Sequence, residues 1–297
     1  MSLVEKVLTP PAVRRNAHKA KLLWKRLFFW PLHAARKPRL SNFAGAPRST
    51  LPIVRLRLEF DHGCGGGDSS LSVFNSIKPL TRRSRAVKGA RAFAPTPMVI
   101  DLREHQGFDD WAKKVSKLTE GKYRRSANKA RRLGYVTRTI GIDSYKRSLH
   151  ALTASKPRRS KGVVVVASIL GPPPSVIDTK APPIPPACPR HWRVDWGAFR
   201  DTDDGERLDA YALVMRAGDV VWVQAFIGHG AALTDGVTKL LMFDVMRWLL
   251  ERRDPAVEGV HYLVHGYAEE GRVGLFDWKR YFAFEPMLLE IGDAHAH

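Results

Sequence analysis

The chain has 297 residues, of which 44% are hydrophobic and 26% are charged, and its formal net charge is +20. This length suffices for one large domain or two small ones with hydrophobic cores. No apolar run approaches the roughly 20 residues that a membrane helix requires, and the first residues lack the apolar segment of a secretory signal. We therefore expect a cytoplasmic protein, or one held peripherally at the inner face of the membrane.

Two cysteines, Cys64 and Cys188, form no metal-ligand pattern, so no metal site is expected. So few thiols indicate a reducing compartment, although one disulfide between them stays open.

The positive charge is concentrated in two segments. Residues 1–48 contain 11 lysines and arginines against one acid, and residues 113–161 contain 16 against two. Residues 162–297 are mildly acidic, with 13 basic and 19 acidic side chains. Such local excesses point to a polyanionic partner, which could be nucleic acid, a phosphorylated ligand or an anionic membrane. Solubility and a solvated helix face are the alternative.

The first segment, residues 1–48, is predicted to be a basic N-terminal arm. Leu22, Leu23 and Leu27 share one face of a short helix that Pro31 ends. Because basic side chains flank that face, residues 20–35 are expected either to contact a membrane surface or to dock on the body of the protein.

Residues 49–170 are predicted to form an N-terminal α/β portion with basic helices. In chain order we expect a half-exposed strand at 53–60, a strand at 98–102 and a helix from about 108. A basic helix follows, with an apolar stripe through Tyr123, Ala127 and Ala130 and a C-cap at Gly134. After it we expect a strand at 135–140 and a helix that ends before Pro157. The apolar run 162–171 is expected to be a buried strand.

Residues 171–190 are proline-rich and are predicted to be a linker. Residues 191–297 follow as a compact C-terminal domain. Its expected elements are a strand at 191–199, a hairpin over 208–228, an amphipathic helix at 235–252, a strand at 260–267 and a short helix at 275–282.

Two short motifs resemble those of a known family. The first stands at Lys122, Arg125, Lys129, Ala130 and Gly134, and the second at Trp278, Lys279, Phe284 and Pro286, with Ala283 in the usual glycine position. Together they resemble the GNAT acyltransferase superfamily over about residues 98–290, and more closely its Fem-type branch, which adds amino acids to peptidoglycan precursors from aminoacyl-tRNA. The resemblance implies a mixed, mainly antiparallel sheet with flanking helices, plus a reduced N-terminal GNAT-like portion.

The resemblance also implies where the acyl donor binds. In the GNAT fold, backbone N–H groups of the turn between a central strand and the following helix bind the donor's phosphates. The matching residues here are Gly228, His229, Gly230, Thr234, Asp235, Gly236 and Lys239. The superfamily's usual glycine-rich turn pattern is absent, so acyl-CoA and aminoacyl-tRNA both stay open as co-substrates, and no tightly bound cofactor is expected. The alternative is that these glycines only form the turn by which the chain leaves the β-hairpin.

Acyl transfer to an amine also needs a route for one proton. The catalytic candidates are His191, Asp195, Tyr211 and Tyr281, with His229 and His265 also considered; for each histidine, a structural role is the alternative. Anionic groups of the substrates are expected to meet Arg125, Lys129, Lys156, Arg159, Lys279 and Arg280. Lys279 in particular is predicted to face a cleft, so that its replacement would lower donor affinity and leave stability almost unchanged.

These observations predict an acyltransferase that moves an acyl or aminoacyl group from a phosphorylated or tRNA-linked donor to an amine acceptor, in cell-envelope or polysaccharide metabolism. Residues 113–161 would then contact tRNA or another polyanion. Two alternatives stay open: a non-enzymatic RNA-binding protein, and a degenerate acyltransferase fold that serves as a scaffold.

Overall fold

The structure is a computed structural model that describes residues 51–59, 73–75, 77, 96–156, 158–159, 162–163, 175, 178–183, 185–186, 188–269 and 273–292. The chain divides into two compact units, Met1–Pro47 and Arg48–His297, and the described residues all belong to the second. The predictions for the basic arm, for Cys64 and for most of the apolar run 162–171 lie outside the described residues.

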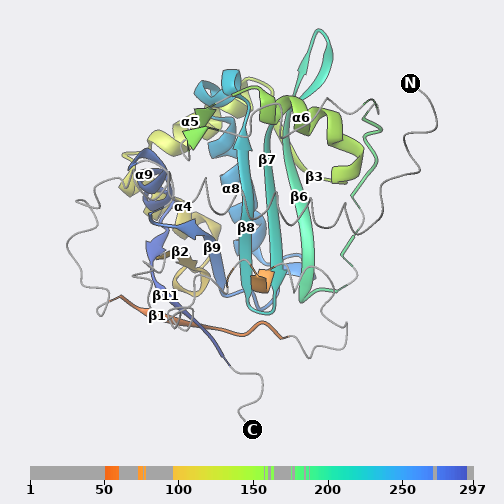
Figure 1. The fold of residues 1–297 in the computed structure, drawn as a ribbon. Coiled ribbons are helices and arrows are strands. Elements are labelled where there is room, and N and C mark those ends of the chain that lie inside the picture. The colour runs from red at the N-terminus through yellow and green to blue at the C-terminus, as the bar shows by residue number, and fades with distance from the viewer. Residues whose placement is uncertain are drawn as a thin grey trace, which may run out of the picture. The chain divides into compact units, whose positions relative to one another are not determined.

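A seven-stranded mixed sheet forms the centre of the second unit (Figure 1). Its order is β10-β2-β9-β8-β7-β6-β3, and every neighbouring pair is antiparallel except β8 and β9, which are parallel. The strands are β2 (Pro97–Asp101), β3 (Val136–Ile140), β6 (His191–Thr202), β7 (Gly205–Ala217), β8 (Val220–Gly228), β9 (Tyr262–Tyr267) and β10 (Glu285–Pro286). The predicted fold class, a mainly antiparallel sheet with flanking helices, is confirmed.

The hairpin of β7 and β8 is the longest continuous apolar part of the sheet. Its two-residue turn, Gly218 and Asp219, connects the paired residues Ala217 and Val220. Gly218 has φ +58°, and a methyl group on it would lie 1.9 Å from the carbonyl oxygen of Arg57, so only glycine fits there. β7 is buried from Leu208 to Ala217 and β8 from Val220 to Val223, so in these stretches both faces of the sheet are covered.

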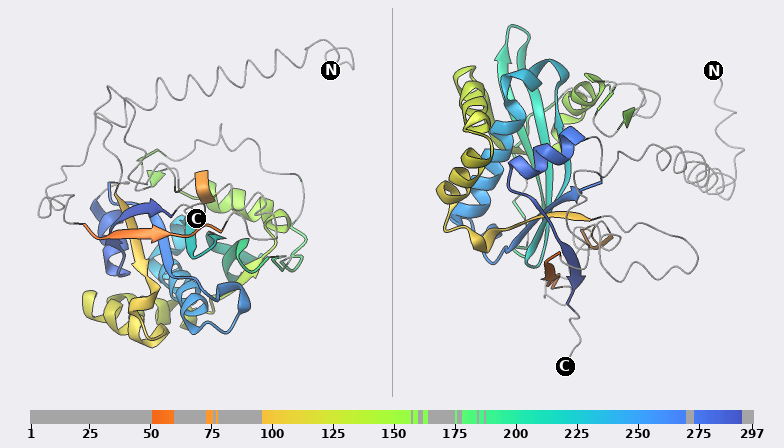
Figure 2. Two further views of the ribbon diagram at one scale, coloured as in Figure 1. Left: turned by 90° about the horizontal axis from the view of Figure 1, so that it is seen from below. Right: turned by 90° about the vertical axis from the view of Figure 1, so that its left-hand side faces the viewer.

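Helices cover both faces of the sheet. They are α4 (Phe108–Leu118), α5 (Lys122–Arg132), α6 (Lys146–Ala154), α8 (Val237–Glu251) and α9 (Val273–Tyr281), with short 3-10 segments η7 (Leu102–Glu104), η8 (Ile142–Tyr145), η9 (Gly230–Asp235) and η10 (Pro255–Val257). α4, α5 and α8 lie on one face and α6 lies on the other (Figure 2).

The aromatic segment near the end of the chain belongs to the core on the α8 face. Phe282 stacks on Trp111 of α4, with ring centroids 6.2 Å apart, and lies edge-on to Phe243 of α8 at 6.0 Å. Trp278 of α9 is 4.7 Å from Phe282. These rings bury the ends of three helices together, which explains the dense aromatic run in the sequence.

Two further strand pairs complete the described structure. β1 (Ile53–Leu56) pairs in parallel with β11 (Leu288–Ile291), and β4 (Arg158–Arg159) pairs with β5 (Gly162–Val163). The strand expected at 53–60 is therefore present over its first four residues.

The central sheet joins segments that the sequence divided between two portions. β2 and β3 come from residues 49–170, yet β2 pairs with β9 and β3 pairs with β6 of the C-terminal domain. The predicted linker thus connects strands of one sheet. None of the helices among the described residues is long and apolar enough to cross a bilayer.

Candidate active site

The two parallel strands at the centre of the sheet separate partway along their length. β8 and β9 pair only at Val220–Tyr262, Val221–Leu263 and Trp222–Val264. On its other edge β8 stays paired with β7 as far as Gly228. We call the ends at which the two strands do not pair with each other, residues 223–228 of β8 and 265–267 of β9, the strand fork. A central strand therefore has an edge that is not paired with its neighbouring strand, and such an edge is where an extended ligand can form hydrogen bonds.

A β-bulge lies at the start of the fork. On β7, Leu213 pairs with Ala225 whereas the next residue, Val214, pairs with Val223, so Gln224 is the extra residue on β8. A bulge bends its strand and increases the local twist, which accounts for the separation of β8 from β9 at this point. Gln224 is exposed and residues 225–227 are partly exposed, although they belong to a central strand.

His265 joins the two strands at the vertex of the fork. Its Nδ1 lies 3.3 Å from the carbonyl oxygen of Val223, and because a carbonyl only accepts, Nδ1 is the donor. Rings of Phe226, Trp278 and Phe284 surround the imidazole with centroids 6.1, 5.7 and 5.9 Å away. His265 is thus the titratable side chain closest to the point of separation.

Lys279 does not face an open cleft as predicted. Its side chain is fully buried, and Nζ donates a hydrogen bond of 3.0 Å to the carbonyl oxygen of Tyr267. The residue therefore holds α9 on the end of β9, and we expect Lys279→Ala to lower stability because it would leave a cavity and an unsatisfied carbonyl. Arg280 is exposed, with its guanidinium 5.8 Å from the centroid of Phe276.

The N-terminus of α8 follows the fork after the 3-10 segment η9. Its N-cap, Gly236, adopts φ +89° and provides no side-chain cap. Within the described part of the chain the amides of Val237 and Thr238 donate no hydrogen bond, whereas those of Lys239 and Leu240 donate to Gly236. These amides and the positive helix end form a local site for negative charge.

Lys239 adds a cation at the same helix end. Its Nζ lies 5.8 Å from the centroid of Tyr123, and no carboxylate among the described residues pairs with it. Burial, together with the nearby charge of Lys122, lowers the pKa of Lys239. An ammonium without a counter-ion is the group that an incoming phosphate would satisfy.

The three glycines of the predicted donor turn are required by packing against protein atoms. A methyl group on Gly228, Gly230 or Gly236 would lie 2.5 Å from Thr238, 2.7 Å from Ser155 and 2.2 Å from Ser126, respectively. The N–H of Gly230 donates to Ser155 Oγ at 3.0 Å, and that of His229 donates to the Asp209 carbonyl at 2.7 Å. The turn is therefore packed between α5 and α6, and these two amides are not available to cradle a phosphate.

The acidic residue of this turn belongs to an internal network. Lys129 Nζ lies 3.1 Å from the carbonyl oxygen of Thr234 and 3.7 Å from Asp235. The hydroxyl of Tyr135 lies 3.0 Å from Asp209 and 3.2 Å from Asp235. The network ties α5, β7 and η9 together, so Thr234, Asp235 and Lys129 position the start of α8.

The structure brings together two of the four catalytic candidates. The Tyr211 hydroxyl donates to the buried Asp195, which also accepts from Arg193 Nε at 3.1 Å. Burial raises the pKa of Tyr211, and the hydrogen bond to Asp195 raises it further. This pair lies on the paired strands β6 and β7, and Tyr211 is opposite Ile227 of the fork across the β7–β8 pairing.

The other two candidates lie elsewhere. His191 Nε2 donates to the carbonyl oxygen of Leu58 at 2.8 Å, and its Nδ1 is 3.8 Å from Cys188 Sγ. Tyr281 is partly exposed at the end of α9, with its ring 5.6 Å from that of Tyr123. Tyr281 and Lys239 thus both contact Tyr123.

The basic side chains of α4 and α5 fall into two groups. Arg125 bonds to the carbonyl of Glu120, Lys129 pairs with Asp235, and Arg131 pairs with Asp244 at 2.6 Å. A second group, which has no acidic partner among the described residues, is exposed and consists of Lys113, Lys117, Lys122, Arg124 and Arg132. Lys156 lies beside Gly230, and the side chain of Arg159 is outside the described residues.

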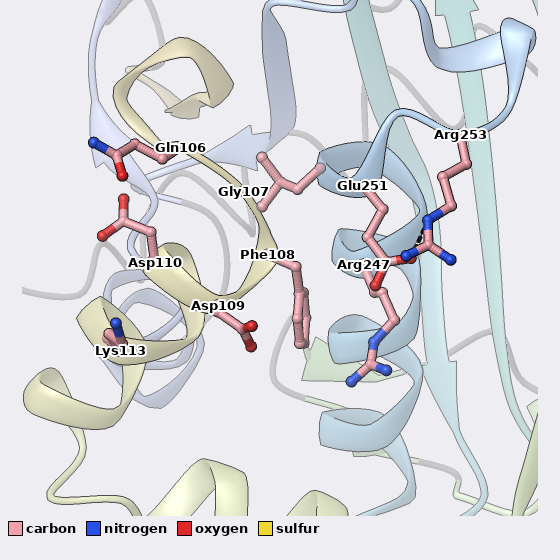
Figure 3. A pocket seen from close by; sticks show the side chains of 10 residues that line it. Gln106, Gly107, Phe108, Asp109, Asp110, Lys113, Arg247, Glu251 and Arg253 are labelled. Carbon is pink, nitrogen blue, oxygen red and sulfur yellow. Dashed lines mark ion pairs between the residues drawn. The ribbon is translucent and has the colours of Figure 1, made fainter.

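A hollow of about 570 Å³ opens between the start of α4 and the end of α8 (Figure 3). Arg247 lies 4.4 Å over the ring of Phe108 in its wall, and Arg253 pairs with Glu251 at 3.6 Å. The hollow mixes three cations with three carboxylates, and none of the predicted site residues lines it. Among the described residues no group of three His, Cys, Asp or Glu could hold a metal ion.

No protein-family model and no curated protein matches the chain. Several solved structures are similar to this chain. A C-terminal domain assigned to a lysylphosphatidylglycerol synthetase of Agrobacterium fabrum is 14% identical with a TM-score of 0.38, covering 65% of this chain and 58% of that chain. A tandem GNAT protein from the clavulanic acid biosynthesis pathway is 15% identical with a TM-score of 0.38, covering 65% and 50%. The L-PGS of Bacillus licheniformis is 11% identical with a TM-score of 0.34, covering 58% and 45%.

This chain thus matches about half the length of these three solved chains. At such low scores they assign no role to any residue, and the Fem-type branch suggested by the two motifs stays a prediction.

Proposed function

We propose that this protein transfers an acyl or aminoacyl group from a phosphate-bearing donor to an amine. The observation that carries the proposal is the strand fork, from which the chain continues through η9 to the N-terminus of α8. The edge of β8 that does not pair with β9 offers backbone donors and acceptors to an extended donor chain. The Val237 and Thr238 amides and the Lys239 ammonium offer positive charge to a phosphate at one end of it.

The chemistry needs little more than this arrangement. An activated ester or thioester reacts with an amine once the two are held close and the carbonyl is polarised. In the proposed complex the strand edge fixes the direction of the donor, and the helix end fixes its phosphate. The partly exposed Ala225, Phe226 and Ile227 would contact the acyl end of the donor.

The donor that we favour is tRNA-linked, because the exposed cations of α4 and α5 suit a nucleic acid. Lys113, Lys117, Arg124 and Arg132 have no acidic partner in the part of the chain that the structure describes. Neutralising phosphates with such cations releases counterions and makes binding steeply salt-dependent. An acyl-CoA donor would need only the fork and the α8 end. We place the reaction in cell-envelope or polysaccharide metabolism, with an amine of that material as acceptor.

Equilibrium binding with two probes tests the proposal. Acetyl-CoA and a mixture of aminoacyl-tRNAs are titrated into the wild type and into Lys239→Met, which keeps the apolar stem of the side chain. We expect one probe to bind, and Lys239→Met to weaken it about tenfold, as for loss of one charge-assisted hydrogen bond. Lys146→Met is the matched control, since Lys146 pairs with Asp143 on η8. Equal binding by all three proteins would contradict the donor site.

The exposed cations also favour a second function, RNA binding without catalysis. The double variant Arg124→Ala/Arg132→Ala separates the two, because both side chains are exposed on α5 and have no acidic partner among the described residues. If deacylated tRNA binds as tightly as aminoacyl-tRNA and no amine becomes acylated, the binding function stands alone. If the double variant lowers tRNA affinity and the product still forms, more slowly, the cations serve the transferase.

A further inference from the structure

Helix α9 extends from the strand fork towards the cations at the start of α8. At the fork, the ring of Trp278 lies 5.3 Å from that of Phe226. Tyr281 follows three residues later, and its ring is 5.6 Å from Tyr123 of α5, which in turn is 5.8 Å from Lys239 Nζ. Residues three apart on a helix are neighbours. Tyr281 is therefore next to the fork on one side and to the proposed phosphate contact on the other.

The ring of Tyr281 is held in place but is not covered. It meets the ring of Tyr123 at 78°, so the two rings do not stack face to face. Tyr123 is itself buried and packs on Phe282 at 4.9 Å. The exposed fraction of Tyr281 is nevertheless 42%, and within the described ranges no other aromatic side chain is so exposed. A fixed ring with an uncovered surface is suited to stack on a planar ligand.

Positive charge surrounds this ring. Arg280 comes directly before it on α9 and is exposed. Lys122 begins α5 and lies close enough to Lys239 for its charge to act on that ammonium. The carboxylate of Asp277 lies one turn earlier on α9, and these three cations outnumber it. The surface around Tyr281 therefore attracts an anion as well as a planar ring.

From this arrangement we infer that Tyr281 is the side chain on which the nucleobase of the donor stacks, while Lys239 contacts the adjoining phosphate. The assignment rests on the donor site proposed above. An exposed aromatic ring among cations is the composition of sites that bind unpaired nucleotides, because every base has a π face and every nucleotide a phosphate. Tyr281 then has a binding role in place of the proton transfer that the sequence predicts.

The ligand class that fits is an adenosine phosphate. An aminoacyl-tRNA ends in a single-stranded adenosine whose ribose carries the aminoacyl ester, and an acyl-CoA carries an adenosine phosphate at the far end of its chain. Both donors therefore bring a purine and a phosphate to the same place. With the base on Tyr281, the ester of the tRNA would lie about one helical turn from Trp278 at the fork.

Removing the same contact from the protein and from the ligand tests the assignment. Adenosine 5′-monophosphate (AMP) carries a base and a phosphate, whereas ribose 5-phosphate carries the phosphate alone. Both are titrated by calorimetry into the wild type, Tyr281→Phe, Tyr281→Ala and Lys239→Met. Leu133→Ala is the matched control, since Leu133 is an apolar side chain that is 40% exposed at the opposite end of α5 from Tyr123.

We expect Tyr281→Ala to weaken AMP binding about 5–100-fold and to leave ribose 5-phosphate unchanged, because only AMP has a base to stack. Tyr281→Phe and Leu133→Ala should bind both ligands like the wild type. Lys239→Met should weaken both ligands about tenfold. Wild-type affinity of Tyr281→Ala for AMP would overturn the assignment. So would equal behaviour of AMP and ribose 5-phosphate towards the wild type, including binding of neither.

The full donors identify the source of the nucleotide and separate this assignment from the proposed function. Acetyl-CoA and mixed aminoacyl-tRNAs are titrated into the wild type and Tyr281→Ala, and acylation of ethanolamine is followed by mass spectrometry. The donor that binds the wild type should bind Tyr281→Ala more weakly. If it binds both equally, the assignment fails and the transferase stands. If AMP binding depends on Tyr281 but neither donor is bound or used, the nucleotide site stands and the proposed function fails.

Photo-cross-linking to the wild type covers the case in which Tyr281→Ala does not fold. 8-Azidoadenosine 5′-monophosphate is irradiated with the protein, and the labelled peptides are identified by mass spectrometry. The peptide that contains Tyr281 should be labelled, and an excess of AMP, but not of ribose 5-phosphate, should prevent the labelling. Labelling confined to other peptides would overturn the assignment.

Discussion

The two ends of β8 differ in how their polar groups are satisfied. At the hairpin end the Arg216 guanidinium is fully buried and donates to the carbonyls of Gly218, Ala256 and Glu258 at 2.7, 2.7 and 2.6 Å. The carbonyl oxygen of Asp219 accepts two hydrogen bonds. The donors are the amide of His261, just before β9, and the amide of Tyr262, the first residue of β9. At the fork end β8 is no longer paired with β9, and Lys239 has no carboxylate partner among the described residues.

This comparison shows how one sheet can be held rigid at one end and still be able to bind a ligand at the other. The closed end holds β7, β8 and β9 in register through protein–protein hydrogen bonds. The open end begins where Gln224 interrupts the register. Polar groups that the fold leaves unsatisfied there are the ones that a ligand can satisfy.

The largest effect is expected from breaking the closed end at Arg216. Burial lowers the pKa of Arg216 to about 10, and its charge is balanced by carbonyl groups and not by a contacting carboxylate. Arg216→Ala should leave three buried carbonyls without their donor and lower the free energy of unfolding by about 3–4 kcal/mol. Chemical denaturation measures this value. A loss below about 1 kcal/mol would show that water replaces the guanidinium.

The turn before α8 offers a matched pair of glycine variants. Gly236→Ala should cost about 2–3 kcal/mol, because the new methyl group would lie 2.2 Å from the Ser126 carbonyl in addition to the positive φ. Gly134 has φ +82° with nothing within 4 Å, so Gly134→Ala should cost only about 1 kcal/mol. Thermal unfolding of both variants checks the difference; equal losses would show that the turn yields without strain.

At the closed end, the buried carboxyl group of Asp219 should make the free energy of unfolding depend on pH. Burial raises the pKa of its carboxyl group to about 6 from an ordinary value of 3.8. The folded state therefore disfavours the ionised form, so the stability contribution is present below pH 4 and is lost as the pH rises to about 6. The loss amounts to about 2–3 kcal/mol.

Asp219→Asn should remove this contribution to the pH dependence, so that the variant becomes relatively more stable above pH 6. The control is the free energy of unfolding of both proteins at pH 4, where they should agree. His261, which is 3.7 Å away, has a lowered pKa and loses stability as the pH falls, and the difference between the two proteins separates these opposing trends. Parallel curves for the two proteins would contradict the raised pKa.

The smallest effect on stability is expected at the open end. Lys239→Met removes an ammonium that burial and Lys122 already disfavour, so the free energy of unfolding should change by less than about 0.5 kcal/mol or rise slightly. Donor affinity should nevertheless fall, as described above. A marked destabilisation would mean that the ammonium supports the fold, chiefly through the ring of Tyr123.

Local patterns in the sequence predict most of the individual elements. The alternation and turn of residues 208–228 predict the hairpin, and the apolar face of 235–252 predicts α8, which the structure places at Val237–Glu251. Both predictions depend on neighbours in the chain, which is why they are confirmed. The pairing of β2 with β9 and of β3 with β6 depends on distant segments, and nothing in the local pattern indicates it.

The candidate site is harder to predict for the same reason. The bulge at Gln224 is a shift of register between two strands, and "VVWVQAFIG" carries no glycine or proline at that position to signal it. The glycines of 228–236 suggest a ligand turn, but Gly230 and Gly236 are required by contact with Ser155 and Ser126, which are distant in sequence. Likewise, the amphipathic pattern around Lys279 does not show that the lysine points inward.

The pairing of β1 with β11 sets the order in which this unit can be completed. Ile53 is opposite Leu288, and the amide of Leu288 donates to the carbonyl of Pro52. Contacts between residues so far apart in sequence form slowly, because the loop must close before they contribute any stability. During synthesis the first strand therefore waits for nearly the whole chain before it finds its partner. The apolar side chains of β1 need protection in that interval, and chains halted on the ribosome before residue 288 should remain sensitive to protease near residue 53.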